Sequence, residues 1–267
     1  MASTIQIRDV RVCLEDEGDG SPLLLLHGFP ATRHLWSRVA PLLVSAGYRL
    51  VIPDLIGYGD SEAPTGVRID MASQAGWMLE LLDRLGVSRP VIIAHDVGSA
   101  AAQLMVANAP QRFRGLAVLD GVHATEWAMH AITSIQSWDL ADADRLLPVL
   151  ARRLGKSAAL REMLTAYQGA RGGLRLIRAA RDLDPTQTAD IAERLRASGV
   201  PAIVLWGERD EFLPCAEVGE PLAKLLHAPL IKLPGGHFTP LDCPTEVSQA
   251  LRPFLDSLPI NRSIAAD

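Results

Sequence analysis

The stretch Pro90–Gly98, which reads PVIIAHDVG, decides the fold. Its apolar first half predicts a buried strand, and the small residues two positions on either side of Asp96 predict a sharp turn into a helix. This spacing is typical of a nucleophile elbow, a turn that holds one reactive side chain clear of the backbone. Most such turns carry serine, whereas a carboxylate can displace a leaving group from carbon and form an alkyl ester.

Short apolar runs and helical stretches alternate on both sides of this turn. The predicted strands are residues 4–16 (one or two edge strands), 23–26, 50–53, 91–94, 116–119 and 202–206, and the predicted helices are 33–46, 70–85, 98–109 and 243–256. Strand alternating with helix predicts an α/β fold with a mostly parallel, doubly wound sheet.

One long segment interrupts the alternation. Residues 123–197 show no convincing strand, only helical patterns rich in Ala, Leu and Arg. We therefore predict a helical lid inserted after the strand that ends at Asp120, so that residues 1–122 and 198–267 form the core and residues 123–197 the cap. We expect the lid arginines to form a solvated face, with binding of an anionic substrate as the less favoured reading. They are Arg152, Arg153, Arg161, Arg171, Arg175, Arg178 and Arg181.

Composition excludes several classes of protein. The 267 residues are 48% hydrophobic, enough for a large core, and the net charge of -5 gives no basic surface for nucleic acid. The three cysteines lack metal-ligand spacing, so we expect neither a disulfide framework nor a metal site. No apolar run approaches the roughly 18 residues that span a bilayer, and the first ten residues lack a signal-peptide core. A cytoplasmic protein without a membrane partner is therefore expected.

The chemistry is expected at the carboxyl ends of the parallel strands, where such sheets bind ligands. Asp96 is the candidate nucleophile, because the amide dipoles of the following helix favour its ionised form. The alternative for Asp96 is a helix N-cap. His237, in the loop Gly235–Phe238, is the candidate base that activates water, and it comes last in chain order, as a hydrolase triad requires.

Two carboxylates compete to orient His237. Asp210 follows the strand 202–206 and can accept the imidazole Nδ1 proton, and we favour it over Asp120, which ends another strand. A second motif, His27–Pro30 (HGFP), can present the Phe29 amide beside the Val97 amide as two donors for an oxyanion. Pro30 allows a cis peptide bond there, and the plain alternative is a simple turn.

Together these motifs resemble the α/β-hydrolase fold, and within it the branch with an aspartate nucleophile: haloalkane and haloacetate dehalogenases and epoxide hydrolases. The motifs HGFP, DLIGYGDS, HDVG, GERD and GH occur in the family's order, at His27–Pro30, Asp54–Ser61, His95–Gly98, Gly207–Asp210 and Gly236–His237. The resemblance implies a small-molecule substrate, an ester on Asp96, water activated by His237, and no metal or organic cofactor.

No subfamily is matched cleanly. Haloalkane dehalogenases usually carry Trp after the nucleophile and fluoroacetate dehalogenases carry Arg, whereas this chain has Val97. Many haloalkane dehalogenases have Asn at the position of Phe29, and fluoroacetate dehalogenases use an acid at the position of Asp120. Ala94 replaces the more usual glycine of the elbow.

The lid residues do not decide between dehalogenation and epoxide hydrolysis either. Epoxide hydrolases use two lid tyrosines, and Tyr167 is the only tyrosine of this lid. We take His95, Trp127, Trp138 and Tyr167 as candidate substrate-binding residues; His123 and His130 are further possible donors. Dehalogenation and epoxide hydrolysis therefore stay equally weighted. A cofactor-independent lyase or oxygenase and a non-catalytic ligand receptor are the other readings, and the oligomeric state stays open.

Overall fold

The computed structural model describes residues 2–154 and 164–259. Eight strands form one sheet in the order β1-β2-β4-β3-β5-β6-β7-β8. Their bounds are β1 Ser3–Ile7, β2 Val10–Glu17, β3 Ser21–Leu26, β4 Tyr48–Pro53, β5 Val91–His95, β6 Gly115–Leu119, β7 Ala202–Gly207 and β8 Leu230–Leu233. Strands β1 and β2 are antiparallel at one edge and β3 to β8 run parallel, which confirms the predicted sheet.

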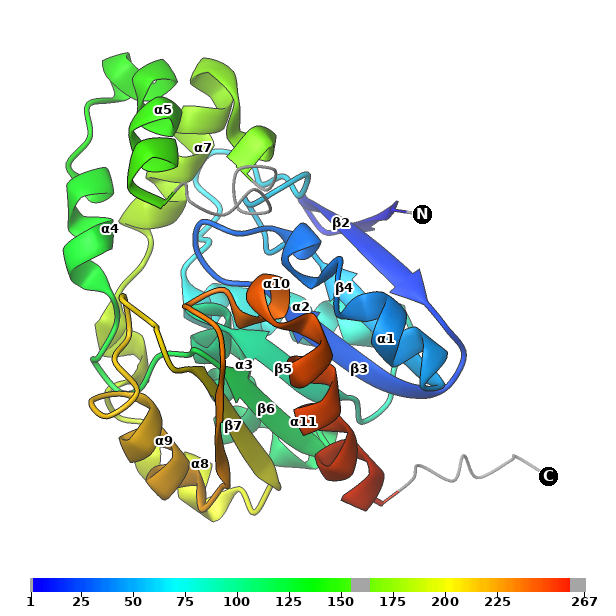
Figure 1. Cartoon of the computed structure of the whole chain (residues 1–267). Helices are drawn as coiled ribbons and strands as arrows, with labels where there is room; N and C mark the ends of the chain where they lie inside the picture. Colours follow the sequence, from blue (N-terminus) through cyan, green and yellow to red (C-terminus); the bar gives the residue numbers. More distant parts are fainter. Residues whose placement is uncertain (1, 155–163, 260–267) are drawn as a thin grey trace.

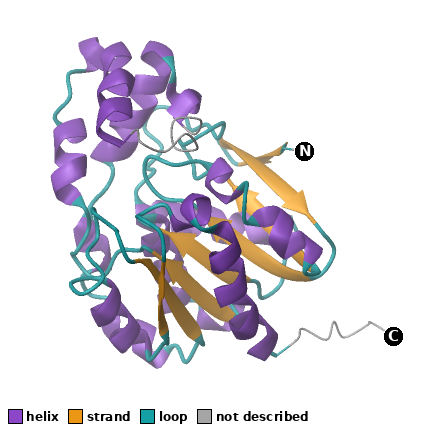
Figure 2. Cartoon of the chain, viewed as in Figure 1, coloured by secondary structure: helices purple, strands orange, loops and turns teal. Residues whose placement is uncertain are grey.

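Helices cover both faces of the sheet (Figures 1 and 2). The core helices are α1 Ala40–Ser45, α2 Met71–Arg84, α3 Gly98–Asn108, α8 Ala192–Ala197, α9 Gly219–Leu226, α10 Thr239–Asp242 and α11 Pro244–Ser257. Two apolar clusters fill the spaces between the layers: one joins α2, α3 and α9 to one face, and the other joins α1 and α11 to the opposite face. In the described part of the chain, no helix has both the length and the apolar character to cross a membrane.

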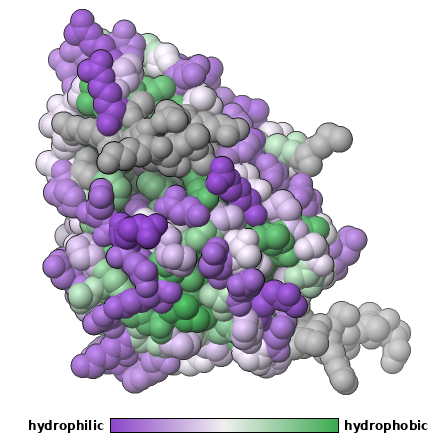
Figure 3. Space-filling view, in the orientation of Figure 1, coloured by the Kyte–Doolittle hydropathy of each residue, from purple (hydrophilic) through white to green (hydrophobic). Residues whose placement is uncertain are grey.

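The central strands are apolar on both faces because they lie between the two helical layers. All residues of β5, β6 and β7 are buried, as expected of strands that are covered on both sides. At the sheet edge, apolar side chains of β8 and α11 line a surface groove, and Figure 3 shows this hydrophobic area low in the view. Most of the remaining surface in this view is hydrophilic.

The described residues between β6 and β7 form helices joined by loops, with one isolated β-bridge between His123 and Glu126. Helices α4 Met129–Gln136, α5 Ala143–Leu154 and α7 Gly169–Arg181 lie at the top of Figure 1, beyond the carboxyl ends of the strands. Helix α8, inside the predicted cap 123–197, instead packs on α3 and α9 of the core. The cap limits therefore stay a prediction.

The lid is fixed to the core through α7 and the short helix before it. The Tyr167 hydroxyl donates to the Ala31 carbonyl at 3.2 Å and accepts from the Gly59 amide at 3.4 Å. Arg178 donates to the backbone carbonyls of Ala63, Pro64 and Val67. The lid arginines thus differ in role: Arg178 joins lid to core, Arg152 is exposed as predicted, and Arg161 lies outside the described residues.

Candidate active site

Asp96 lies in a strained turn between β5 and α3. Its φ of 50° is in the left-handed region, which costs a non-glycine residue about 1–3 kcal/mol and is found where function requires it. The turn is supported by Ser99, whose hydroxyl donates to the Asp96 carbonyl at 2.6 Å and accepts from the Val122 amide at 3.0 Å. Ser99 therefore has a packing role.

Two glycines allow this turn to approach the end of β3. A Cβ at Gly98 would lie 2.2 Å from the His27 carbonyl oxygen, and one at Gly28 would lie 2.3 Å from Asp96 Oδ1. Both distances are far below van der Waals contact, so both positions need glycine. As a result, the loop after β3 and the elbow pack directly on each other.

The Asp96 carboxylate faces this loop and is not a helix N-cap. Its Oδ1 accepts a 2.7 Å hydrogen bond from the Phe29 amide, and no side chain caps the start of α3. Burial raises the pKa of Asp96, but His237 and the Val97 amide outweigh it, so the pKa lies below its usual value. Asp96 is therefore a carboxylate at neutral pH.

His237 lies between two carboxylates. Its Nδ1 is 2.9 Å from Asp210 Oδ2, and its Nε2 is 3.6 Å from Asp96 Oδ2. The other Asp210 oxygen accepts from the amides of Phe212 and Leu213, which fix its orientation. Burial lowers the pKa of His237, but the two carboxylates outweigh it and raise the pKa to about 10.

Asp120, the alternative acid, makes different contacts. One of its oxygens accepts from the Gly207 amide at 2.6 Å and the other from the Thr239 hydroxyl. The carboxyl group is completely buried, and burial, with a smaller contribution from Asp210, raises its pKa to about 8 although the charge on His237 opposes the rise. Asp210, and not Asp120, is thus the hydrogen-bond partner of His237.

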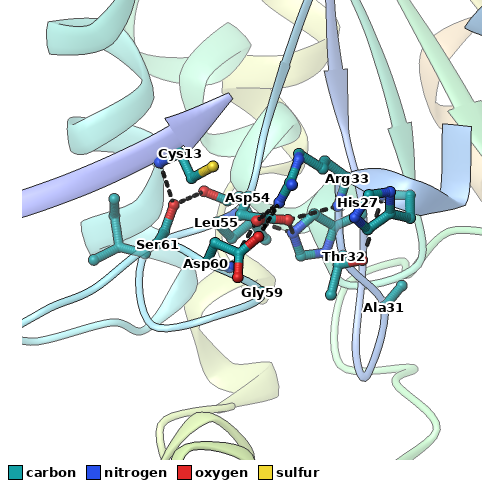
Figure 4. Close-up of polar contacts among 12 residues, drawn as sticks. Cys13, His27, Ala31, Thr32, Arg33, Asp54, Leu55, Gly59, Asp60 and Ser61 are labelled. Carbon is teal, nitrogen blue, oxygen red and sulfur yellow. Dashed lines mark hydrogen bonds and ion pairs between the residues drawn. The ribbon is translucent and has the colours of Figure 1, made fainter. Parts of the chain in front are cut away.

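A buried polar cluster holds the loop that carries Phe29. Figure 4 shows Arg33 reaching the carboxylates of Asp54 and Asp60, and the Arg33 amide also donates to Asp54 at 2.7 Å. The bond between Phe29 and Pro30 is cis, as the sequence allows. Cys13, Asp54 and Asp60 are the one group of potential metal ligands in the described residues, but the Arg33 guanidinium already binds both carboxylates.

The cavity above Asp96 is mostly apolar. It has an empty volume of about 660 Å³, part of it open to solvent. Its lining residues come from the core loops and from the undersides of α4 and α5, with Asp96 and His237 as the reactive groups. They are Phe29, Pro30, Asp96, Ala128, Ile132, Ile135, Leu150, Phe212, His237 and Phe238.

None of the four residues predicted to bind substrate is among the described lining residues of this cavity, and their role in binding stays a prediction. The Trp127 indole donates to Ala124 and Thr188, and the Trp138 indole donates to the Asp142 carbonyl. Tyr167 joins lid to core, and His95 contacts the backbone of His237. Both indole N–H groups therefore donate to protein acceptors, and neither tryptophan lines the cavity.

Sequence reasoning missed the apolar lining. Phe238 follows His237 directly and Phe212 comes two residues after Asp210, so both could have been found from their proximity to the motifs. Ile132 and Ile135 are three residues apart on α4, a spacing that places two side chains on one helix face. The identity of that face as a cavity wall depends on how the lid packs.

Known proteins that are similar in sequence to part of this chain include two dehalogenases and an epoxide hydrolase. A fluoroacetate dehalogenase from Burkholderia sp is 38% identical over 120 residues, 43% of this chain and 39% of the relative. A haloalkane dehalogenase from Psychrobacter cryohalolentis is 37% identical over 41% of this chain and 37% of the relative. An epoxide hydrolase from Caballeronia sordidicola is 34% identical over 42% and 34%. The matched segment thus spans well under half of each relative.

The solved structures extend the likeness of fold to nearly the whole chain. An α/β hydrolase fold protein from Burkholderia ambifaria superposes with a TM-score of 0.80 at 23% identity, covering 93% of this chain and 96% of that one. The family model described as alpha/beta hydrolase fold matches residues 21–159, just over half of the 267 residues. On this match and on the sheet order, elbow and loop geometry described above, the chain belongs to the α/β-hydrolase fold family.

Proposed function

We propose that this protein is a hydrolase that forms a covalent ester on Asp96 and then hydrolyses it with water activated by His237. One observation carries the proposal: Asp96 lines the cavity, its Oδ1 is held by the Phe29 amide, and its Oδ2 is 3.6 Å from His237 Nε2. A carboxylate fixed through one oxygen has the other oxygen available for attack on carbon.

The proposed reaction has two steps. In the first, Asp96 Oδ2 forms a bond to an sp³ carbon and the leaving group departs with the electron pair of the broken bond. In the second, water attacks Cγ of Asp96 and His237 Nε2 takes the water proton, while the Phe29 and Val97 amides stabilise the oxyanion. The ester C–O bond then breaks, the alkoxide takes the proton from His237, and the new carboxyl group loses its remaining proton to solvent.

The charge balance of the site suits this order of events. In the free protein the two flanking carboxylates keep the pKa of His237 high. Esterification neutralises Asp96 and removes one of these charges, so the pKa of His237 falls. The imidazolium then loses its proton, to the alkoxide when an epoxide opens or to solvent when a halide leaves, and His237 is neutral at the stage where a base is needed. Asp210 remains to orient the ring and to stabilise the imidazolium that forms.

The cavity favours a small neutral substrate. No Arg or Lys is among its described lining residues, and apart from His237 no lining side chain there donates a hydrogen bond. For a haloacetate the one cationic group in the described lining is the His237 imidazolium, which already lies between Asp96 and Asp210. Haloalkanes and epoxides are therefore the better candidates, in line with the names of two of the relatives. We give the two leaving groups equal weight.

The test is a single turnover in heavy-oxygen water, followed by mass spectrometry of the Asp96 peptide. Solvent oxygen is expected in Asp96, because water enters at Cγ, and the Asp96→Ala variant serves as the unlabelled control. His237→Ala should accumulate the alkyl-enzyme. Verified turnover without label would exclude the covalent route and leave the lyase or oxygenase reading.

The substrate panel contains 1-bromobutane, chloroacetate and styrene oxide, and halide release is measured beside diol formation. Halide without diol assigns a dehalogenase, and diol without halide assigns an epoxide hydrolase. Tight binding of panel members without product or trapped ester would instead support a ligand receptor.

A further inference from the structure

His95 is a completely buried histidine that directly precedes Asp96 and makes one polar contact. Its Nε2 is 2.7 Å from the backbone carbonyl oxygen of His237. A carbonyl oxygen only accepts, so Nε2 carries the proton and Nδ1 carries none. Nδ1 has no hydrogen-bond partner. Burial of the unpaired Nδ1 costs free energy, and the bond from Nε2 to the His237 carbonyl is the one hydrogen bond that the ring makes.

The ring remains neutral over the whole working range of pH. Burial and the nearby charge of His237 together lower the pKa of His95 to about 4. The two ring centroids are 4.9 Å apart, so a charged His95 would repel the imidazolium of His237. A neutral ring donates its hydrogen bond without disturbing the charge of the base.

The main chain beside His237 is held by hydrogen bonds of its neighbours, whereas the His237 carbonyl is held by His95. The Gly236 amide donates to Asp242 at 2.9 Å, and the Phe238 carbonyl accepts from the amides of Leu241 and Asp242. In the free protein the attraction between the imidazolium and the Asp96 carboxylate also holds the ring in place. That attraction disappears once Asp96 is esterified, so the hydrogen bond to Asp210 is the remaining polar contact of the ring, and the bond from His95 holds the main chain of the same residue.

We propose that His95 is a positioning residue for the second half-reaction: its Nε2–H holds the His237 carbonyl so that the His237 ring keeps facing Asp96 after the ester has formed. This role rests on the proposed function. The first step does not depend on the contact, because the Asp96 carboxylate is held by the Phe29 amide, which is a separate hydrogen bond. Loss of the His95 bond should therefore slow hydrolysis of the ester and leave its formation unchanged.

The experiment separates the two steps by rapid quench and intact-protein mass spectrometry, with the panel member that turns over best. In His95→Leu we expect ester formation within about twofold of wild type and hydrolysis slower by about 10²-fold, the usual effect of a 1 Å misplacement. The kcat and KM values should fall together, so that kcat/KM is preserved. His95→Gln, whose side-chain amide can donate to the same carbonyl, should recover most of the rate.

Two controls keep the result specific. His34→Gln changes an exposed histidine that lies outside the cavity lining, and it should leave both steps unchanged. If His95→Leu does not fold, His95→Asn replaces it, because its shorter amide does not reach the carbonyl. Unchanged hydrolysis in a folded His95→Leu or His95→Asn variant, or equal slowing of both steps, would overturn the proposal.

A readout without substrate distinguishes failure of this inference from failure of the proposed function. The titration of the His237 ring is followed by NMR in the Asp96→Asn variant, whose neutral amide stands in for the esterified side chain. Adding His95→Leu to this variant should lower the pKa of His237, because a displaced ring loses part of the attraction to Asp210. An unchanged pKa overturns the positioning role, whereas a lowered pKa in a protein that never forms an ester contradicts only the proposed reaction.

Discussion

At the scale of single residues, the two carboxylates near His237 have separable roles. Asp210 bonds to the imidazole Nδ1, whereas Asp120 bonds to Gly207 and Thr239. We expect Asp210→Asn to lower kcat by about 10²–10⁴-fold, because the amide no longer fixes the imidazole tautomer or stabilises the imidazolium. Asp120→Asn should retain activity within about tenfold, since its amide can replace both hydrogen bonds. Steady-state kinetics on both variants checks this, and a reversed order of the two losses would make Asp120 the acid.

The burial of Asp120 also predicts a pH dependence of stability. Its pKa in the folded protein is about 8, above the value of about 3.9 in an unfolded chain. The folded state therefore binds the proton more tightly, so the stabilisation is complete below pH ~4 and is lost as the pH rises through about 8. Relative to wild type, Asp120→Asn should gain free energy of unfolding over this range. Urea unfolding of both proteins at pH 5 and pH 9 measures it; a constant difference would refute the raised pKa.

The candidate catalytic side chains could be picked out from the sequence because each lies at a fixed offset from a strand end. Asp96, Asp210 and His237 follow β5, β7 and β8, and parallel strands bring such positions to one edge of the sheet. The contacts of the lid residues Trp127 and Trp138 could not be predicted from the sequence, because the direction of an indole N–H depends on packing between helices. Residue type alone does not distinguish an N–H that faces a cavity from one that bonds to a nearby carbonyl.

At the scale of elements, two glycines that lie in helices have opposite requirements. At Gly98 an added Cβ would meet the His27 carbonyl at 2.2 Å, whereas nothing lies within 4 Å of one at Gly76, which is exposed in α2. Gly98→Ala should push α3 away from β3 and lower both the melting temperature and the activity. Gly76→Ala should stabilise the protein by about 0.5–1 kcal/mol through helix propensity. Thermal unfolding and kinetics on both variants test this, and a stable, active Gly98→Ala would contradict the close approach.

The elements themselves were predicted where periodicity was long and were missed where proline or glycine interrupts it. The predicted helix 33–46 is two pieces, a short helix Arg33–Trp36 and α1, because Pro41 in the first turn of α1 starts a new helix. Helix α9 was not predicted. Its sequence contains Gly219 and Pro221, and proline is tolerated in a first turn although it reads as a helix breaker.

At the scale of the whole molecule, the lid and the core are joined mainly along α7. Arg178 donates to three backbone carbonyls of the loop after β4, whereas Arg145 makes an exposed pair within the lid. Arg178→Gln should lower the free energy of unfolding by about 1–3 kcal/mol and speed amide hydrogen exchange in residues 62–70. Arg145→Gln should change either quantity little. Equal exchange rates in the two variants would show that Arg178 does not hold the lid.

The main chain and the side chain of Phe29 have different contacts, one with Asp96 and the other with the cavity. The Phe29 backbone amide donates to the Asp96 carboxylate, and every substitution except proline keeps this amide. The Phe29 ring forms part of the cavity wall. Substitutions at this position can therefore change the size of the cavity, and so the size of the molecules that fit, while the amide proposed to stabilise the oxyanion is kept. A library of variants at position 29 would change substrate selectivity while Asp96 and His237 stay unchanged.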